Sequence, residues 1–272
     1  MDLAHKRLVV TGASSGIGRS LVRELSSRPV QVVAVARDET RLRAATQGRA
    51  ARARVMPFAC DLAREAEVDR LFDYAVEQMG GIDIFAANAG RGYWQRSNEP
   101  DWGRIEEILR LNVFSPIYAA QKMAALFPEA DYRVVVTSSV LGRIGLEGYA
   151  LYAASKAALD RFAEVYRLER GKRGGMILVY PLAVRSGFFQ AAGGPVPWLS
   201  QSPESVARAI VRGIELDKEA IYGSWILPPL LLLDRLLPFA RRCYQALDAR
   251  VSRRAHQPES KTNQSKGSSM DK

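Results

Sequence analysis

Cysteine is scarce in this chain, which has only Cys60 and Cys243 among its 272 residues. Two cysteines so far apart in the sequence provide neither a disulfide framework nor a metal site. Their scarcity favours a reducing, cytoplasmic compartment, and we expect no bound metal.

The chain also lacks the pattern of a leader or of a membrane-spanning helix. Residues 1–7 lead directly into a short apolar stretch, without the charged-then-apolar order of a signal peptide. The most apolar segment, 225–239, is interrupted by three prolines, Asp234 and Arg235. A spanning helix needs about 20 apolar residues, so we expect that this segment does not cross a bilayer.

The net charge of +10 allows three kinds of anionic partner: nucleic acid, a membrane surface or a phosphorylated ligand. No nucleic-acid-binding motif occurs, and the basic residues are scattered among acidic ones except near the C-terminus. We therefore expect no nucleic-acid partner.

The length, with 47% hydrophobic residues, suits one large α/β domain. Apolar strands and helical stretches alternate about six times, which predicts a Rossmann-like, doubly wound parallel sheet of about seven strands with helices on both faces. We expect this domain over 1–223, a helical extension over 224–251 and a disordered tail over 252–272. The expected strands cover 8–10, 30–36, 55–59, 82–87, 132–137, 176–180 and 220–222, and the expected helices cover 19–27, 38–51, 64–79, 102–127, 149–170 and 202–216.

A glycine-rich turn, Thr11-Gly12-Ala13-Ser14-Ser15-Gly16-Ile17-Gly18, joins the first strand to the first helix. Glycines permit a tight turn, and the following helix offers free N–H groups and its positive dipole end to a phosphate. The spacing is Gly-x-x-x-Gly-x-Gly, not the commoner Gly-x-Gly-x-x-Gly, and such a turn also occurs as an ordinary connector.

The second strand ends without an acidic residue, and Arg37 follows it. In dinucleotide-binding folds an acid at this point holds the ribose hydroxyls, whereas a basic residue accommodates a 2′-phosphate. Arg37 therefore favours NADP(H) over NAD(H). Asp38, one residue later, keeps NAD(H) as an alternative, and Arg37 could also lie unengaged in solvent.

Tyr152 and Lys156 lie four residues apart in the expected helix 149–170, on one face of it. An adjacent positive charge favours the phenolate of a tyrosine, whose ordinary pKa is about 10. The pair is thus a candidate general acid/base. The same spacing also suits a half-buried tyrosine beside a solvated lysine.

Six features, in order and over about residues 6–222, resemble the short-chain dehydrogenase/reductase family. They are the turn from Thr11 to Gly18, Asp61, Asn88-Ala89-Gly90, Asn112, Ser139 thirteen residues before Tyr152, and Tyr152-x-x-x-Lys156.

The resemblance implies hydride transfer between a nicotinamide and a substrate carbonyl or carbinol. It makes Tyr152 the general acid/base and Ser139 the group that binds the substrate oxygen. It also implies that Lys156 lowers the pKa of the tyrosine and binds the ribose, and that Asn112 holds a water of a proton relay. This agrees with the physical chemistry, since hydride arrival leaves an alkoxide that an acidic phenol and a hydroxyl donor stabilise.

The expected cofactor contacts come from the same edge of the sheet, where Asp61 could accept from an adenine amino group or cap the next helix. They are Thr11, Gly12, Ser14, Ser15, Gly16, Ile17, Gly18, Arg37, Asp61, Leu62, Asn88, Ala89, Gly90, Tyr152, Lys156, Pro181, Val184 and Ser186. The chain departs from the family at Leu182, where the family has Gly after Pro181, while Ser186 replaces the usual Thr. Leu182 adds bulk where the backbone usually approaches the cofactor.

The family's substrate loop corresponds to residues 183–201. Aromatic and apolar residues of this loop and of the segment after the fourth strand could line an apolar pocket, or could form a lid that packs on the fold. They are Phe188, Phe189, Trp198, Leu199, Tyr93 and Trp94. With Ser139 and Tyr152 they predict a lipophilic carbonyl or alcohol as substrate.

The apolar and arginine-rich segment 225–254 fits either a helix at a membrane surface or one buried against protein. We therefore expect a cytoplasmic protein with an optional peripheral site at the inner membrane surface. The family resemblance implies a homodimer or homotetramer. Two other functions stay open: a catalytically silent dinucleotide sensor, which Leu182 supports, and a membrane-surface scaffold.

Overall fold

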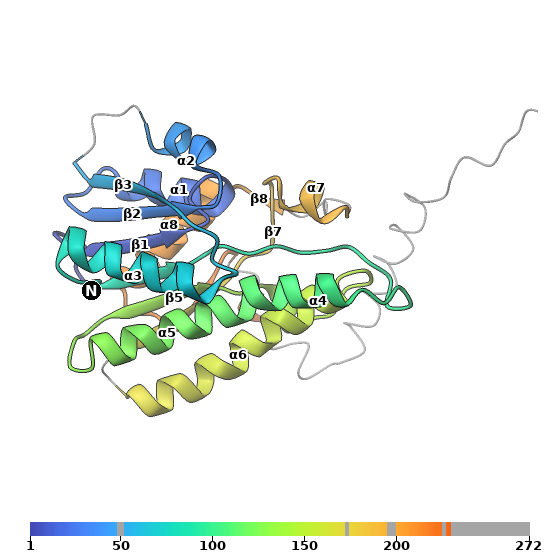
Figure 1. Ribbon diagram of the computed structural model, residues 1–272. Coiled ribbons are helices and arrows are strands. Elements are labelled where there is room, and N and C mark those ends of the chain that lie inside the picture. The colour runs from blue at the N-terminus through green and yellow to red at the C-terminus, as the bar shows by residue number, and fades with distance from the viewer. Residues whose placement is uncertain (48–51, 172–173, 195–199, 225–226, 230–272) are drawn as a thin grey trace, which may run out of the picture.

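The computed structural model describes residues 1–47, 52–171, 174–194, 200–224 and 227–229. Seven parallel strands form one sheet in the order β3-β2-β1-β4-β5-β6-β9 (Figure 1). The strands are β1 (Arg7–Thr11), β2 (Gln31–Ala36), β3 (Arg54–Ala59), β4 (Ile84–Ala87), β5 (Arg133–Thr137), β6 (Gly175–Tyr180) and β9 (Ala220–Tyr222). The expected Rossmann-like fold is confirmed.

Helices cover both faces of the sheet. One face carries α1 (Gly16–Leu25), α2 (Glu39–Thr46) and α8 (Pro203–Glu215). The other carries α3 (Glu65–Met79), α5 (Ser115–Leu126) and α6 (Ala150–Arg170). Shorter elements are α4 (Trp102–Leu109), η1 (Arg110–Phe114), η2 (Val140–Gly142) and α7 (Phe188–Ala192).

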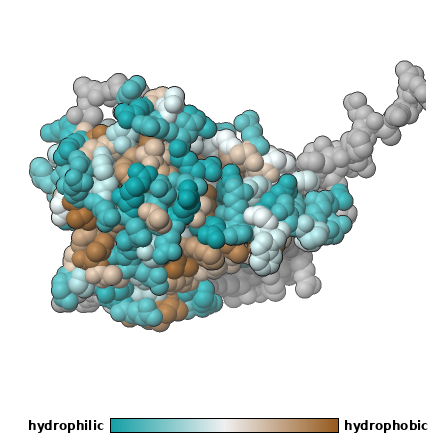
Figure 2. Space-filling view, viewed as in Figure 1, coloured by the Kyte–Doolittle hydropathy of each residue, from teal (hydrophilic) through white to brown (hydrophobic). Residues whose placement is uncertain are grey.

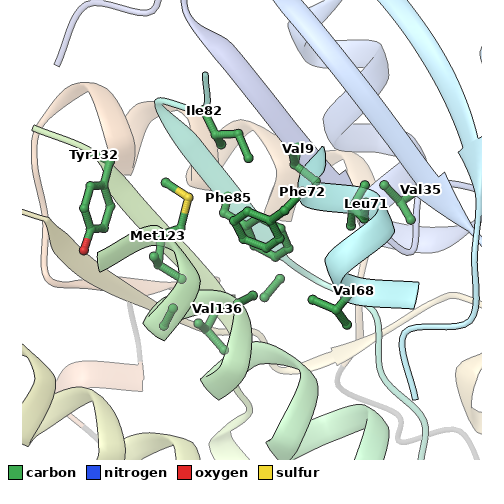
Figure 3. Close-up of a cluster of buried hydrophobic side chains, with 14 of the residues drawn as sticks. Val9, Val35, Val68, Leu71, Phe72, Ile82, Phe85, Met123, Tyr132 and Val136 are labelled. Carbon is green, nitrogen blue, oxygen red and sulfur yellow. The ribbon is translucent and has the colours of Figure 1, made fainter. Parts of the chain in front are cut away.

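The strands are apolar on both faces because each face packs against helices. In β2, Val33 and Val35 belong to the core under α3, whereas Val32 and Ala34 belong to the core under α1. On the α3 side, the rings of Phe72 and Phe85 stack at 5.3 Å between strand and helix (Figure 3). Successive side chains of a strand thus point to opposite faces of the sheet and pack under different helices.

The expected helix 102–127 is not regular throughout. It is interrupted at its centre by η1, a π-turn around Asn112, in which the Ser115 N–H bonds to the Arg110 carbonyl. One-turn π segments often occur at functional positions, because they redirect one side chain without ending the helix.

Residues 183–201 also contain a feature that the sequence did not indicate. Two short strands, β7 (Ala183–Val184) and β8 (Ser200–Gln201), pair in parallel. The start of α8 is as expected, with Pro203 at its first position and the Ser202 hydroxyl accepting from the Ser205 N–H at 3.2 Å. The expected helix 38–51 ends at Thr46.

The order of the strands creates the crevice in which ligands bind in such folds. The chain runs from β1 outward to β3, then returns to β4 beside β1 and continues outward to β9. The carboxyl ends of β1 and β4 therefore flank the switch point.

Some expectations fall outside the described residues. They concern Trp198, Leu199, the tail 252–272 and all but residues 227–229 of the segment 225–254. Within the described part of the chain, no helix combines the length and the apolar character needed to cross a membrane.

Candidate active site

Thr11, at the end of β1, and Asn88, just after β4, shape the carboxyl edge of the sheet. The Thr11 hydroxyl accepts from the main-chain N–H groups of Asn88 and Ala89, both at 2.9 Å. The Asn88 amide donates to the Thr11 carbonyl and accepts from the Thr137 hydroxyl, both at 3.1 Å. Asn88 therefore ties the ends of β1, β4 and β5 together.

The glycine turn after β1 packs tightly against this edge. Gly12 and Gly16 have φ of +68° and +51°, a region that favours glycine. A Cβ on Gly18 would lie 2.3 Å from the Gly12 carbonyl oxygen and 2.7 Å from the Asn88 amide nitrogen. The backbone can follow this path only without side chains at these positions, and it directs the first N–H groups of α1 outward.

A pocket of about 400 Å³ opens at the N-terminus of α1. Four expected cofactor residues line it: Ser14, Ser15, Gly16 and Ser186. A Cβ on Gly16 would lie 3.3 Å from the Ser186 Cβ, so Ser186 faces the glycine turn as expected for the cofactor side of the loop. The pocket has the donors that a phosphate group requires.

Three arginines that the sequence did not single out also line this pocket: Arg19, Arg41 and Arg185. None of the three forms a salt bridge with another described residue, whereas Arg43, two residues after Arg41, pairs with Glu39. Unpaired cations around a pocket attract an anion. They come from three different elements, so only the fold brings them together.

Arg37 lies at the end of β2 as expected and is exposed, but it does not line this pocket. The Asp38 carboxylate accepts from the Arg41 N–H at 2.9 Å and caps α2. That carboxylate is thus engaged at a helix N-terminus.

Asp61 does not cap the following helix, so that alternative was wrong. Its carboxylate accepts from the Ala63 N–H at 3.2 Å, because α3 begins only at Glu65, with Arg64 at the cap position. Leu62 is buried in the core, as are Pro181 and Val184, so these residues offer a ligand mainly their main chain.

Ser139, Tyr152 and Lys156 meet at the same edge. Tyr152 and Lys156 lie near the start of α6, and both are buried. The Lys156 ammonium lies 5.6 Å from the centroid of the Tyr152 ring and donates to the Thr137 carbonyl at 2.7 Å. Ser139 lies in the loop after β5 and hydrogen-bonds to the Tyr152 phenol. The structure thus brings the expected acid/base group, hydroxyl and lysine together.

The pKa of Tyr152 shifts in the opposite direction from the one expected. Burial raises it to about 12, and the hydrogen bond from Ser139 only partly offsets this rise. Burial also lowers the pKa of Lys156 to about 8, against the opposing effect of Asp160. The expected depression of the tyrosine pKa is therefore wrong for this structure, because desolvation disfavours the charged form of both groups.

Asn112 uses its whole amide to join three segments. Its oxygen accepts from the Arg91 N–H at 2.9 Å, and its nitrogen donates to the Arg91 carbonyl at 2.8 Å and to the Ser155 hydroxyl at 3.0 Å. Both N–H groups are thus bonded to protein. A relay water at Asn112 must therefore donate to an oxygen of this residue.

The expected substrate residues gather in one apolar cluster around Tyr152. The cluster includes Tyr93, Trp94, Tyr149, Tyr152, Phe188 and Phe189. The Phe188 ring packs on Tyr152 with 5.2 Å between centroids. The main-chain N–H of Trp94 donates to the Ala192 carbonyl at 2.8 Å, which ties α7 to the segment after β4. These contacts fit the alternative of a lid that packs on the fold, and a substrate pocket lined by these residues stays a prediction.

Tyr93 is more polar in its contacts than its place in this cluster suggests. Its hydroxyl donates to the Glu107 carboxylate and accepts from Arg91 at 3.1 Å. The guanidinium of Arg104 lies 5.3 Å from its ring centroid. Tyr93 therefore offers a substrate its ring, not its hydroxyl.

Comparison with known proteins gives consistent matches. A family model described as short chain dehydrogenase matches residues 6–192. An uncharacterized oxidoreductase of Myxococcus xanthus is 33% identical over 247 residues, which cover 87% of this chain and 94% of the relative. The 11-beta-hydroxysteroid dehydrogenase A of Sesamum indicum is 32% identical over 78% of this chain and 66% of its own.

Solved structures share the fold. A short-chain dehydrogenase from Sphingobium yanoikuyae in complex with NADPH superposes with a TM-score of 0.73, at 23% identity, over 95% of this chain and 98% of its own. A short chain dehydrogenase/reductase from Burkholderia phymatum in complex with NAD gives a TM-score of 0.75, at 22% identity, over 86% of this chain and 94% of its own.

Proposed function

The chain belongs to the short-chain dehydrogenase/reductase family, and from this premise we propose that it interconverts a lipophilic ketone or aldehyde and its alcohol, with NADP(H) as the preferred cofactor. The observation that carries the proposal is the convergence of Ser139, Tyr152 and Lys156 in a chain that also has a cationic pocket at the N-terminus of α1. A protein that only bound a dinucleotide would need the pocket but not the buried acid/base group.

The roles of the three residues follow from their contacts. The Tyr152 phenol, with a pKa of about 12, is protonated at neutral pH and can donate that proton to a carbonyl oxygen as it becomes an alkoxide. Ser139 offers a second donor to the same oxygen. Lys156, with a pKa of about 8, is mostly protonated at pH 7 and places a positive charge beside the phenol. When bound, the nicotinamide supplies or accepts the hydride.

Turnover itself is tested with purified protein, NADPH and a panel of lipophilic ketones. The expected result is NADPH oxidation by the wild type and a loss of about 10² to 10⁴-fold in Tyr152→Phe, with NADPH binding retained. Tyr74→Phe on α3 is the matched control. A wild type that binds NADPH but oxidises none with any ketone would favour the silent sensor or the scaffold, and equal turnover in wild type and Tyr152→Phe would contradict the role of Tyr152.

The preference for NADP(H) rests on the distribution of positive charge. Arg37 directly follows β2, at a position where a basic residue accommodates a 2′-phosphate, and Arg19, Arg41 and Arg185 line the pocket at the N-terminus of α1. Asp38, the nearest acid after β2, caps α2. We assign Arg41 a share of the 2′-phosphate binding, because it combines a place in this pocket with a guanidinium that no described carboxylate neutralises.

The cofactor preference is tested by fluorescence titration with NADPH and NADH. Losing one charge-assisted contact costs about 1.5–3 kcal/mol, so Arg37→Ala and Arg41→Ala should each weaken NADPH binding by about 10 to 100-fold and leave NADH binding nearly unchanged. Arg43→Ala is the control, since Arg43 pairs with Glu39. Equal losses for both dinucleotides would contradict a 2′-phosphate role.

A lipophilic substrate is supported by the aromatic cluster around Tyr152. The steroid named for the Sesamum indicum relative agrees with this chemistry. Steroidal and long-chain ketones should therefore have a higher kcat/KM than small hydroxy acids. The reverse order would contradict the proposal.

A homodimer or homotetramer is supported by exposed apolar side chains on neighbouring helices. Val165 and Leu168 lie on α6, with Leu168 80% exposed, and Phe114 and Leu126 lie on η1 and α5. Figure 2 shows apolar side chains on the lower part of the molecule, where α5 and α6 lie in the same view of Figure 1. Leu168→Glu should shift the mass measured by light scattering toward the monomer.

Membrane attachment through 225–254 stays a prediction. Cosedimentation with anionic liposomes tests it directly. Deletion of residues 225–272 should abolish cosedimentation, and unchanged cosedimentation of the deletion variant would contradict membrane attachment through this segment.

A further inference from the structure

Asp160 holds both ends of the loop that carries Ser139. This loop runs from Ser138 to Arg143 and includes η2. The Ser138 hydroxyl donates to one oxygen of the Asp160 carboxylate at 2.9 Å, and the Arg143 guanidinium donates to the other oxygen at 2.9 Å. One side chain of α6 thus fixes the start and the end of the segment that positions Ser139.

The backbone of the loop also lies directly against α6. A Cβ on Gly142 would lie 3.0 Å from the carbonyl carbon of Lys156 and 3.1 Å from the nitrogen of Ala157. The loop therefore meets the helix at Lys156, one turn before Asp160. Any movement of the loop relative to α6 would change the separation of Ser139 from Tyr152.

Arg143 is itself held by a third element. Its guanidinium donates to the Tyr180 hydroxyl on β6 at 2.6 Å and lies 4.4 Å from the centroid of that ring. Tyr180 stacks on Tyr222 of β9 with 5.3 Å between centroids. The carboxylate of Asp160 is therefore linked through Arg143 to the sheet as well as to the loop.

The ion pair of Asp160 with Arg143 is more sheltered than the ion pair of Arg161 with Glu164, which also lies on α6. The side chains of Asp160 and Arg143 are 17% and 34% exposed, whereas those of Arg161 and Glu164 are 77% and 60% exposed. Ser138 is buried. Removing one partner of a sheltered pair leaves a charge without compensation, so the geometry depends on all three groups.

We propose that Asp160 is a positioning residue for the proposed reaction, whose carboxylate clamps the loop 138–143 onto α6 so that the Ser139 hydroxyl stays in register with the Tyr152 phenol. The inference rests on the proposed function for its catalytic consequence. The clamp itself is a property of the fold and can be measured without a substrate.

The test compares Asp160→Asn with Glu164→Gln, a matched loss of one carboxylate one turn further along α6. Hydrogen exchange of the main-chain amides in 138–143, followed by mass spectrometry, reports on the clamp without substrate. Steady-state reduction of a ketone that the wild type accepts reports on its consequence. NADPH titration and thermal unfolding confirm that each variant is folded and binds cofactor.

We expect faster exchange in 138–143 for Asp160→Asn only. We also expect its kcat to fall by about 10 to 100-fold, because a displacement of about 1 Å has effects of that size, while the Kd for NADPH and the KM for the ketone stay within about 3-fold. Ser138→Ala removes one of the two ties and should lower kcat less. Adding it to Asp160→Asn should have little further effect, since both act on one element.

Unchanged exchange and unchanged kcat in Asp160→Asn would overturn the inference. If Asp160→Asn does not fold, Ser138→Ala decides the matter by the same two measurements. A wild type that binds NADPH but reduces no ketone would contradict the proposed function, and faster exchange in Asp160→Asn would still support the clamp.

Discussion

The Asn112 amide donates to the Ser155 hydroxyl at 3.0 Å, and Ser155 donates in turn to the Tyr152 carbonyl at 2.7 Å. These two bonds connect the π-turn η1 to the helix that carries Tyr152 and Lys156. Asn112 and Ser155 are both buried, so water does not compete for these bonds. The π-turn and the acid/base group are therefore parts of one buried polar network.

Asn112→Ala should destabilise the fold as well as the site. The substitution leaves the Arg91 N–H and carbonyl without their amide partner and removes the donor to Ser155. Each buried polar group without a partner costs about 1–3 kcal/mol, so we expect a loss of about 3 kcal/mol in the free energy of unfolding in urea. Asn98→Ala, at an exposed position, is the control and should change it by less than about 0.5 kcal/mol.

Lys156→Met should raise stability at pH 7 while it abolishes turnover. The pKa of Lys156 in the folded chain is about 8, below its ordinary value of 10.5, because burial disfavours the ammonium. Between pH 8 and pH 10.5 the lysine of the unfolded chain is more protonated than that of the folded chain, so the free energy of unfolding rises with pH in this range. Below pH 8 the buried ammonium lowers the free energy of unfolding by about 3 kcal/mol.

The variant lacks this cost but also the bond to the Thr137 carbonyl, so we expect a gain of about 1–2 kcal/mol at pH 7. The measurement is the free energy of unfolding at pH 7 and pH 10 for Lys156→Met and for Lys218→Met, an exposed control. A wild-type rise between these pH values that persists in Lys156→Met would contradict the assignment.

The sheet could be predicted from the sequence because its signal is local and repeated. Each strand, such as β2, is a short apolar run, and a helical stretch follows each of the first six strands along the chain. Parallel strands place their carboxyl ends at one edge, so Thr11, Asn88 and Ser139 had to meet there.

The remaining features depend on contacts between distant segments. The π-turn at Asn112 was not expected within helix 102–127, and the side chain of Asn112 bonds to Arg91 and Ser155, which are distant in the sequence. The tyrosine pKa depends on how deeply Tyr152 is buried beneath α7, and the sequence indicates only that Lys156 is near. In the sequence Arg41 is one of several basic residues of the expected helix 38–51, and only the fold places it at the pocket.

Gly18→Ala should disrupt the dinucleotide site. Its Cβ would meet the Gly12 carbonyl oxygen at 2.3 Å, and backbone cannot move aside as a flexible side chain can. We expect a loss of at least about 2 kcal/mol in the free energy of unfolding, together with weaker NADPH binding. Gly187→Ala is the control, since nothing lies within 4 Å of its Cβ position and its φ is −65°. Equal stability of the two variants would show that the turn is not closely packed.

Phe188→Ala should change both the acidity of Tyr152 and the choice of substrate. The Phe188 ring packs on Tyr152 at 5.2 Å and contributes to the burial that raises the pKa of the phenol to about 12. Without this ring we expect that pKa to move down toward its ordinary value, which a titration of phenolate absorbance, taken as the difference from the double variant with Tyr152→Phe, would record.

The space left by the Phe188 ring should also admit bulkier ketones. A pocket that gains room discriminates by about 1–3 kcal/mol, so kcat/KM for a bulky ketone relative to a small one should rise by about 10-fold. Phe162→Ala on α6, outside the aromatic cluster, is the control. An unchanged ratio with an unchanged tyrosine titration would mean that α7 does not cover the reacting group, because a ring packed over Tyr152 cannot be removed without altering either its solvation or the room above it.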